Sequence, residues 1–596
     1  MRYCFARMNA AALFLALLAV DPILPPLPPW NGASRALVVP ANDPWVTPSE
    51  KTGLKDTPSY DETVAYLRKL VDAAPELEMV SLGKSPEGRD IWLVIASKEK
   101  NFTPEKLRRS VKPALFAQGG IHSGEIDGKD AGLMLLRDMT VRGTKRELLD
   151  RANFLFVPIF SVDAHERTSR YSRINQRGPE VSGWRTNARN LNLNREYMKA
   201  DTEEMRAMIR ALDTWDPDLY LDLHVTDGAD YQYDITFGFD GPAGHSPAIA
   251  TWLEQTWRPA MTRALREAGH IPGTLVFPVK DDDVTSGLSE RPSDPRFSHA
   301  YGDVRHIAAA LVENHSLKPY DQRVLGTYVL LENSLRTLGS DGAALRKAIA
   351  SDRARRVDAV PFAWKVPEGA NETIEFLAIE SRTHLSPVTG DVYREFTGKP
   401  VTLRVPYRRG TEVAGSVTRP TAYWVPASWK DIIDRIALHG IKFERITAPR
   451  TIDVEMYRLD EPKYGSEQFE GHVRVTAKTT SERRHETFPA GSIRIPTDQP
   501  LGTLAVLLLE PASPDSFFQW GLFDSVLSVT EYVEPYIMEP TAQKMLEADP
   551  KLEEEFRAKV ANDEAFRANP TERLYWFYRQ TPFYDQRARL YPVGRE

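Results

Sequence analysis

The chain has 596 residues, of which 42% are hydrophobic and 27% charged, and its formal net charge is −7. This composition is typical of a globular protein, and the length predicts two or three domains because a single core rarely grows so large. No basic block or aromatic-basic stripe occurs in the sequence, so nucleic acid is not an expected partner.

The N-terminal segment predicts export. Two arginines precede an uncharged apolar run at residues 10–20, which is too short to span a bilayer and is typical of the core of a signal peptide. We therefore predict a signal peptide over residues 1–36, a periplasmic or extracellular location, and no transmembrane span in the mature chain. A disordered apolar N-terminus is the alternative. The single cysteine, Cys4, lies in this segment, so the mature chain has no disulfide to form.

Hydrophobic periodicity predicts alternating strands and helices after a proline-rich linker at residues 37–58. Ser59 and Glu62 form a capping box that starts the first helix. Apolar runs predict buried strands at residues 78–82, 91–96, 113–117, 153–160, 218–225 and 307–312. Further helices are expected at residues 127–139, 202–212 and 251–268. This alternation predicts the α/β class, with a mixed, mostly parallel sheet and helices on both faces, over residues 59–342.

The remainder of the chain has a different character. Alternating patterns at residues 473–479 and 491–495 predict half-buried strands, so residues 360–535 are expected to form a β-rich accessory domain, with a short helix at residues 430–438. Residues 540–596 are predicted to form a charged helical tail that ends in aromatic side chains, which we expect to dock on the body of the protein.

Two histidines and a glutamate form the strongest chemical signal. His122 and Glu125 lie three positions apart, directly after a predicted strand and a Gly-Gly turn, and His224 ends another predicted strand. Two imidazoles and one carboxylate leave one position open on a tetrahedral zinc ion, as a catalytic zinc requires. Ligands of parallel sheets bind beyond the carboxyl ends of strands, where these residues and Glu313 are all predicted to lie. The sequence therefore predicts one Zn²⁺ per chain.

Polar residues outside this set are candidates for binding and proton transfer. Arginines at positions 185 and 195 flank an asparagine-rich run, which suggests recognition of an anion such as a peptide's free C-terminus. Glu313 ends an apolar run, where a carboxylate is costly unless it is paired or functional; beside zinc, a general base is favoured over a salt-bridged core residue. Asp222 alternates onto the same strand face as His224 and is a candidate acceptor for that imidazole. His165 and Glu166 compete as a metal pair, but adjacent residues of an extended chain point apart, so we expect a structural role or a role in supporting the metal ligands.

The ordered set of these residues resembles the M14 family of zinc carboxypeptidases, the carboxypeptidase A type, over about residues 55–335. The matching residues are Ser85–Arg89, His122–Glu125, Trp184-Arg185, Asn194-Arg195, His224 and Glu313. The resemblance implies that zinc is held by His122, Glu125 and His224. It also implies that Arg185 stabilises the oxyanion, that Asn194 and Arg195 bind the terminal carboxylate, and that Glu313 activates the water.

The chain departs from the family pattern at two places. The family reads Asp-Leu-Asn-Arg-Asn where this chain has an asparagine at position 192 and a glutamate at position 196, which changes the rim of the carboxylate site. Residues 281–299 contain no tyrosine and Tyr301 lies only 12 residues before Glu313, so the sequence does not assign a residue to the role of the family's mobile tyrosine. The acidic run at residues 281–283 could attract basic side chains, although a solvated loop is the simpler interpretation.

The predicted function is that of an exported zinc metallocarboxypeptidase, with peptide or protein C-termini as substrates. Two alternatives remain open at this point: a zinc amidase or esterase acting on murein peptides or other substrates, and a non-catalytic binding protein with a vestigial site. The preferred side chain, the oligomeric state and the role of residues 360–596 are not fixed by the sequence.

Overall fold

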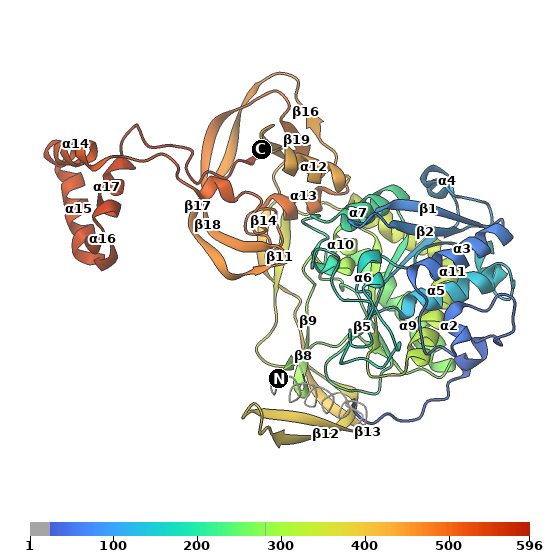
Figure 1. The fold of residues 1–596 in the computed structure, drawn as a ribbon. Coiled ribbons are helices and arrows are strands. Elements are labelled where there is room, and N and C mark those ends of the chain that lie inside the picture. Colours follow the sequence, from blue (N-terminus) through green and yellow to red (C-terminus); the bar gives the residue numbers. More distant parts are fainter. Residues whose placement is uncertain (1–23, 281) are drawn as a thin grey trace, which may run out of the picture. The chain divides into compact units, whose positions relative to one another are not determined.

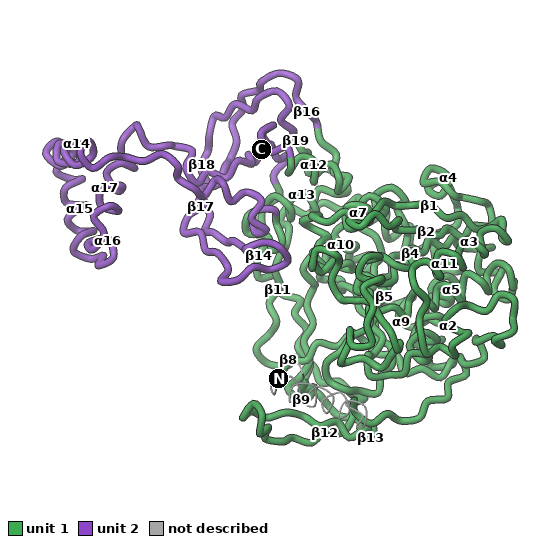
Figure 2. Tube along the Cα trace, in the orientation of Figure 1, with its two compact units in different colours: residues 1–419, 431–443, 495–516 green, residues 420–430, 444–494, 517–596 purple. Residues whose placement is uncertain are grey.

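The computed structural model describes residues 24–280 and 282–596, which form two compact units (Figure 2). Unit 1 contains the described residues up to 419 together with residues 431–443 and 495–516, and unit 2 contains residues 420–430, 444–494 and 517–596. The predicted signal-peptide core and Cys4 lie outside the described residues. Among the described helices, none is both long enough and apolar enough to cross a bilayer.

An eight-stranded mixed sheet forms the centre of unit 1 (Figure 1). In spatial order its strands are β1 (Leu77–Lys84), β2 (Asp90–Ala96), β4 (Asn153–Val157), β3 (Ala114–Gly119), β5 (Leu219–Thr226), β10 (Ala308–His315), β6 (Ile235–Gly238) and β7 (Pro272–Thr274). The central run β4-β3-β5-β10 is parallel. The pairs β1-β2, β2-β4 and β10-β6 are antiparallel, and β7 pairs parallel with β6. Parallel pairing at the centre brings the carboxyl ends of β3, β5 and β10 to one edge of the sheet.

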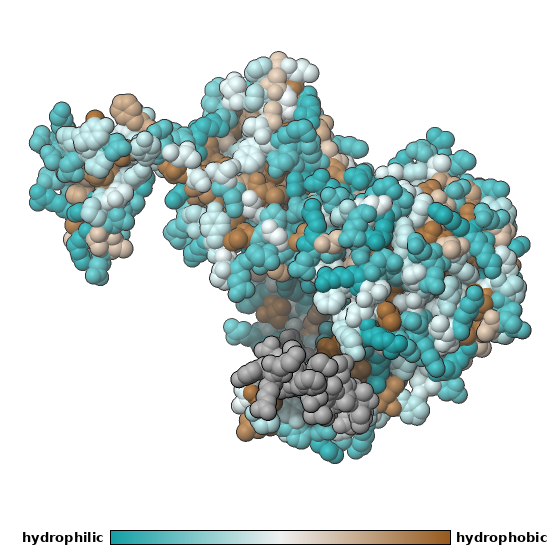
Figure 3. Space-filling view, in the orientation of Figure 1, coloured by the Kyte–Doolittle hydropathy of each residue, from teal (hydrophilic) through white to brown (hydrophobic). Residues whose placement is uncertain are grey.

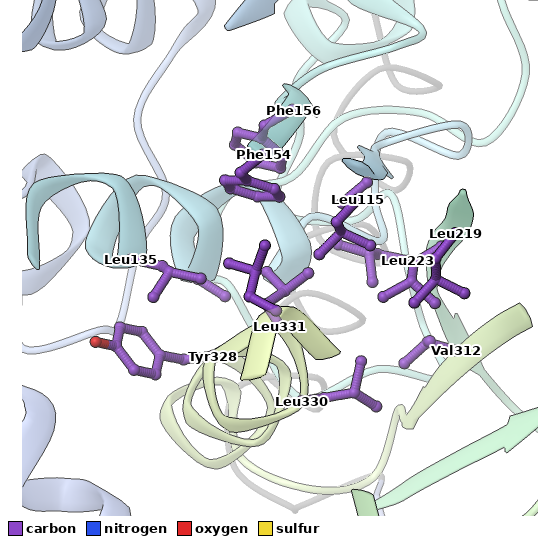
Figure 4. Packing of buried hydrophobic residues seen from close by; sticks show 14 of the residues in the cluster. Leu115, Leu135, Phe154, Phe156, Leu219, Leu223, Val312, Tyr328, Leu330 and Leu331 are labelled. Atoms are coloured by element: carbon purple, nitrogen blue, oxygen red, sulfur yellow. The ribbon is translucent and has the colours of Figure 1, made fainter. Parts of the chain in front are cut away.

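Helices α5 (Asp127–Met139) and α11 (Tyr320–Ala354) pack on one face of this sheet. In Figure 4, Leu115, Leu223 and Val312 point from neighbouring strands toward the leucines of α11. Burying one such side chain stabilises the fold by roughly 1.5–3 kcal/mol, so this shared cluster holds the two helices on the sheet.

The opposite face is covered by α7 (Glu203–Trp215) and α10 (Ser298–Val304). Ala309 points to this face because its neighbours along the strand belong to the α11 cluster. Helix α10 approaches so closely that a Cβ added to Gly302 would lie 2.3 Å from the Ala309 Cβ. The predicted α/β class, with a mixed sheet between two helical layers, is therefore confirmed.

Most predicted elements of this region appear within a few residues of their expected ends. The capping box forms at the start of α3 (Tyr60–Ala73), where Glu62 accepts a hydrogen bond of 2.9 Å from the Ser59 N–H. The single helix predicted at residues 251–268 is instead divided into α8 (Pro247–Trp252), a π-helical turn η4 (Leu253–Trp257) and α9 (Arg258–Glu267). Pro259 lacks the N–H that a regular helix would use here, which explains the wider turn before it.

Unit 1 also contains two smaller sheets. One contains β8 (Pro278–Lys280), β9 (Asp283–Glu290), β12 (Glu372–Leu385) and β13 (Val392–Arg409), and the other contains β11 (Ala359–Lys365) and β14 (Glu412–Thr418). The remaining α-helices before residue 510 are α2 (Pro48–Lys51), α4 (Pro104–Arg109), α6 (Val162–Glu166), α12 (Lys430–Leu438) and α13 (Gly502–Leu509). The face of unit 1 in Figure 3 is largely hydrophilic, with isolated hydrophobic residues.

Unit 2 consists of a sheet and a helical tail. The sheet contains β15 (Ala422–Val425), β16 (Glu444–Arg445), β17 (Arg450–Phe469), β18 (His472–Phe488), β19 (Ile493–Pro496), which runs on into unit 1, and β20 (Gly594–Arg595). The tail contains α14 (Pro535–Ala548), α15 (Pro550–Asn562), α16 (Glu564–Ala568) and α17 (Pro570–Tyr578). The tail aromatics do not follow the prediction that they dock elsewhere: Phe577 and Tyr578 are buried against Met538 and Leu552 of the tail itself. The rings are therefore buried among residues of α14, α15 and α17.

Candidate metal centre and active site

Three neighbouring strands bring the candidate residues to one edge of the sheet. His122 follows β3 after Gly120, whose φ of +67° belongs to the left-handed region that favours glycine. His224 lies near the end of β5, and Glu313 is its register partner on the parallel strand β10. Because β3, β5 and β10 are adjacent, the convergence predicted from the strand ends is present in the structure.

Glu125 lies between the two histidines. Its Oε2 atom is 3.1 Å from the His122 Nδ1 atom and 3.0 Å from the His224 Nδ1 atom, and one potential ligand atom from each residue lies within 4.8 Å of the others. All three residues are buried. Two nitrogen donors and one oxygen donor form a set that suits zinc.

Hydrogen bonds at the Nε2 atoms, which lie away from Glu125, fix the orientation of both imidazoles. His122 Nε2 lies 2.8 Å from the Asn192 side-chain oxygen, and His224 Nε2 lies 2.7 Å from a carboxylate oxygen of Asp222. The Asn192 oxygen also accepts the backbone N–H of Asn194, which identifies it as the acceptor. Each Nε2 therefore carries the proton, and each Nδ1 offers its lone pair towards Glu125 when the imidazole is neutral. This donor set fits a metal ion.

We call His122, Glu125 and His224 the metal set. Charge around it favours the ionised form of the Glu125 carboxylate. Burial works against the charged form of Glu125, but the His122 imidazole and the Arg173 guanidinium hold the pKa of Glu125 well below its usual range. Burial likewise opposes protonation of His224, yet the Asp222 carboxylate and Glu125 hold the pKa of His224 well above its usual range. A cation placed among these groups would replace the His224 proton as the positive partner of the carboxylates.

Glu313 lines one cavity together with His122, Glu125 and His224. Its Oε2 atom is shielded from solvent and has no hydrogen-bond partner among the described residues. Burial raises the pKa of Glu313 to about 8, with the Glu125 carboxylate adding to the rise and His224 opposing it. A buried carboxyl group without a partner is costly, and such groups are enriched at functional sites.

Two arginines contact the other oxygen of Glu125. Arg185, predicted from the sequence, donates a hydrogen bond of 3.0 Å to Oε1, and Arg173 forms an ion pair with the same atom at 3.0 Å. Arg173 reaches this position because residue 124 is glycine: an added Cβ there would lie 2.8 Å from the Arg173 Cδ atom. The sequence analysis missed Arg173, since nothing in its local pattern connects a loop arginine to Glu125.

A cavity of about 390 Å³ lies beside the metal set and also contains the predicted carboxylate-binding pair, Asn194 and Arg195. The Asn194 side-chain oxygen accepts the backbone N–H of Ser298, which leaves its NH₂ group as the donor end. The Arg195 guanidinium carbon lies 4.6 Å from the centroid of the Phe297 ring, which holds it at the cavity wall. The cavity thus contains hydrogen-bond donors suited to an anion.

Several other candidate residues lie in different surroundings. His165 and Glu166 are on the short helix α6, so the prediction that they point apart was wrong; His165 Nδ1 lies 2.8 Å from Glu166 Oε1. That pair is structural, since Glu166 also accepts the N–H of Tyr60. Tyr301 is fully buried and its hydroxyl lies 2.7 Å from His439, which excludes it as a mobile active-site residue in this arrangement.

In the turn that starts at Ser85, the Ser85 hydroxyl donates a hydrogen bond of 2.7 Å to the Asp163 carboxylate. Arg89 forms an ion pair with the same carboxylate at 2.7 Å, so Asp163 fixes the turn from both sides. Of the acidic run, Asp281 lies outside the described residues, and Asp283 pairs with Arg394 rather than lining the cavity. The acidic run therefore gives no support for a site that binds basic side chains of a substrate.

Comparison with known proteins gives matches to a family model, to two relatives and to a solved structure. Residues 63–315 match the family model Peptidase_M14, described as zinc carboxypeptidase. Over 486 residues the chain is 22% identical to "Carboxypeptidase 2" of Trichophyton tonsurans, a match that covers 78% of this chain and 84% of that protein. A shorter match of 110 residues, 32% identical, is to "Inactive metallocarboxypeptidase ecm14" of Schizosaccharomyces pombe, and it covers 17% of this chain and 22% of that protein.

Among solved structures, carboxypeptidase A of Helicoverpa armigera is similar to 50% of this chain and 74% of its own, at 18% identity and a TM-score of 0.35.

Proposed function

We propose, from the premise that a zinc carboxypeptidase domain of the Peptidase M14 family spans residues 63–315, that the protein is a zinc-dependent metallocarboxypeptidase. It would release residues from the C-terminal end of peptides. The observation that carries this proposal is the convergence of two imidazole Nδ1 atoms and one carboxylate beside a cavity that also contains Glu313, Arg185 and the Asn194–Arg195 pair.

His122, Glu125 and His224 would hold the zinc ion, which when bound acidifies a water molecule and polarises a scissile carbonyl. The zinc-holding role is supported by the inward Nδ1 atoms and by the hydrogen bonds that fix both imidazoles. A cation at this position also favours the ionised form of Glu313, because opposite charge lowers the pKa of a carboxyl group.

The other steps are carried by side chains of the cavity. Asn194 and Arg195 bind the terminal carboxylate of the peptide, which places the last peptide bond near the metal set. Glu313 takes a proton from the attacking water at its free Oε2 atom and passes it to the leaving amine. Arg185 donates a hydrogen bond to the carbonyl oxygen as negative charge develops there.

The experiment is to incubate the purified, zinc-loaded protein with pairs of peptides that differ only in a free or an amidated C-terminus, and to follow the products by mass spectrometry. We expect stepwise loss of single C-terminal residues from the free peptides alone, and no loss after chelation. Cleavage of both members of a pair would refute the role of the terminal carboxylate and favour an amidase or esterase.

A non-catalytic metal-binding protein is the second candidate, because one relative is described as an inactive metallocarboxypeptidase. In this chain, however, every residue that the proposed chemistry requires is present at the cavity. Stoichiometric zinc binding without hydrolysis of any peptide in the pool would favour this candidate.

Export is proposed on the sequence of the N-terminus alone. The basic residues and apolar run of residues 1–20 support a signal peptide, and N-terminal sequencing of the protein recovered from its native location would detect removal of that segment.

A further inference from the structure

Alternate residues of β5 form a polar line on one face of the strand. Tyr220, Asp222 and His224 lie on the face opposite to Leu221 and Leu223, since side chains alternate along a strand. Gln118 of β3 is the register partner of Asp222 on the neighbouring strand. Strand pairing therefore places four polar side chains side by side, and their line ends at a candidate zinc ligand.

A continuous chain of hydrogen bonds links these residues. Tyr197 Oη lies 2.7 Å from Tyr220 Oη, and the Tyr220 hydroxyl donates to Gln118 Oε1 at 3.1 Å. Gln118 Nε2 then donates to Asp222 Oδ1 at 3.0 Å, while Asp222 Oδ2 accepts from His224 Nε2 at 2.7 Å. We call Tyr197, Tyr220, Gln118 and Asp222 the Asp222 array.

Only one direction of donation satisfies every member of the array. Asp222 accepts at both oxygens, so Gln118 must present its NH₂ group there and its carbonyl oxygen to Tyr220. The Tyr220 hydroxyl donates its single proton to Gln118, so the Tyr197 hydroxyl must be the donor to Tyr220. Each bond thus fixes the orientation of the next, up to the imidazole proton of His224.

Because the array is buried, water cannot replace any of its hydrogen-bond partners. Gln118, Tyr197 and Tyr220 have no exposed surface, and Asp222 is 1% exposed. Solvent therefore offers no replacement partner when one link is removed, and a buried polar group without a partner is costly.

The two candidate zinc histidines have different outer partners. His122 donates to the neutral amide of Asn192, whereas His224 donates to the carboxylate of Asp222. Of these two partners only Asp222, on β5, is negatively charged. A carboxylate partner makes an imidazole a stronger metal ligand, so this effect falls on His224.

We propose that the Asp222 array is a positioning device for His224 and that Gln118 and Tyr220, which do not touch the metal set, determine zinc affinity. The array holds Asp222 in the orientation that keeps the proton of His224 on Nε2. This inference rests on the metal-binding part of the proposed function.

The test measures the dissociation constant of Zn²⁺ by competition with a chromogenic chelator, at one fixed pH. Gln118→Met keeps the length of the side chain but removes both hydrogen bonds, and we expect about 10- to 100-fold weaker binding, the range found when outer partners of metal ligands are lost. Tyr220→Phe removes a single oxygen atom one link further away and should give a smaller loss, and Tyr197→Phe a smaller loss still.

Tyr301→Phe is the matched control. Its ring packs on Tyr197 at 5.3 Å and is equally buried, but its hydroxyl bonds His439 outside the array. We expect parental zinc affinity in this variant, whatever its melting temperature.

Parental zinc affinity in Gln118→Met, or an equal loss in Tyr301→Phe, would overturn the proposal. If Gln118→Met does not fold, the milder Tyr220→Phe decides, and parental affinity there overturns it too. Since the readout is zinc alone, a parent protein that binds zinc without cleaving peptides refutes the proposed function and still permits this test. A parent that binds no zinc refutes both.

Discussion

Replacement of Glu313 by glutamine separates the contribution of this residue to catalysis from its cost in folding stability. In the metal-free protein burial raises the pKa of Glu313 from its ordinary value of 4.5 to about 8, so the fold favours the protonated form. The unfolded chain releases this proton near pH 4.5, and the stability of the parent therefore falls as the pH rises from 4.5 to 8. Glutamine is neutral throughout and avoids that loss.

The magnitude follows from this interval. At about 1.4 kcal/mol per pH unit, the range between the ordinary value of 4.5 and pH 7 corresponds to about 3 kcal/mol. This figure is an upper limit because part of the side chain faces the cavity. Metal-free Glu313→Gln is thus expected to be up to about 3 kcal/mol more stable than the parent at pH 7, equal to it below pH 4.5, and, when zinc-loaded, slower by about 10²–10⁴-fold.

The assay is calorimetry in the presence of chelator at pH 4.5, 7 and 9, combined with peptide hydrolysis after zinc loading. A metal-free variant that melts at or below the parent at pH 7 and pH 9 would show that the buried carboxyl is not strained. Full activity in the zinc-loaded variant would remove Glu313 from the role of general base.

Two further predictions follow, one on stability at Glu204 and one on activity at Arg195. Burial raises the pKa of Glu204 on α7 to about 7, so Glu204→Gln should stabilise the protein by up to about 3 kcal/mol above pH 7 and leave it unchanged below pH 4.5, with parental turnover; calorimetry across this pH range that shows no gain would contradict the burial argument. Arg195→Gln should lower kcat/KM for peptides with a free C-terminus by about 10- to 100-fold, since charge-assisted hydrogen bonds contribute roughly 1.5–3 kcal/mol. Arg195→Lys should recover part of this loss in the same steady-state assay, and an Arg195→Gln variant with parental kinetics would exclude carboxylate binding by this residue.

The sequence was sufficient to predict strands β1 to β5 and β10 of the central sheet, because each is an apolar run, but not the short strands β6 and β7. It also predicted that His122, Glu125 and His224 come together, because they lie at the ends of those apolar runs. The resemblance to zinc carboxypeptidases is confirmed by the match of residues 63–315. The hydrogen bond from His224 to Asp222 was predictable as well, because strand alternation places both residues on one face.

Features that depend on tertiary packing were not predictable. Helix α11 was missed because its N-terminal half is buried on nearly all sides, so its apolar residues do not repeat on one face of the helix. Arg173 reaches Glu125 across a loop, through space that exists because residue 124 has no side chain. The cross-strand bond between Gln118 and Asp222 depends on the register of β3 against β5, which a single sequence does not specify.

The assembly of the site from β3, β5 and β10 has a consequence for when activity can appear during folding. The strands are neighbours in space, but α5, β4 and α7 intervene between β3 and β5, and β6 to α10 intervene between β5 and β10. Long-range pairings of this kind form late, because the entropy of closing long loops must be overcome first. A chain that is still being synthesised, or is held unfolded, therefore has His122, His224 and Glu313 apart and is inert. The proposed hydrolytic activity would therefore begin only once β3, β5 and β10 are all paired, and a newly made chain would not cleave other proteins before that point.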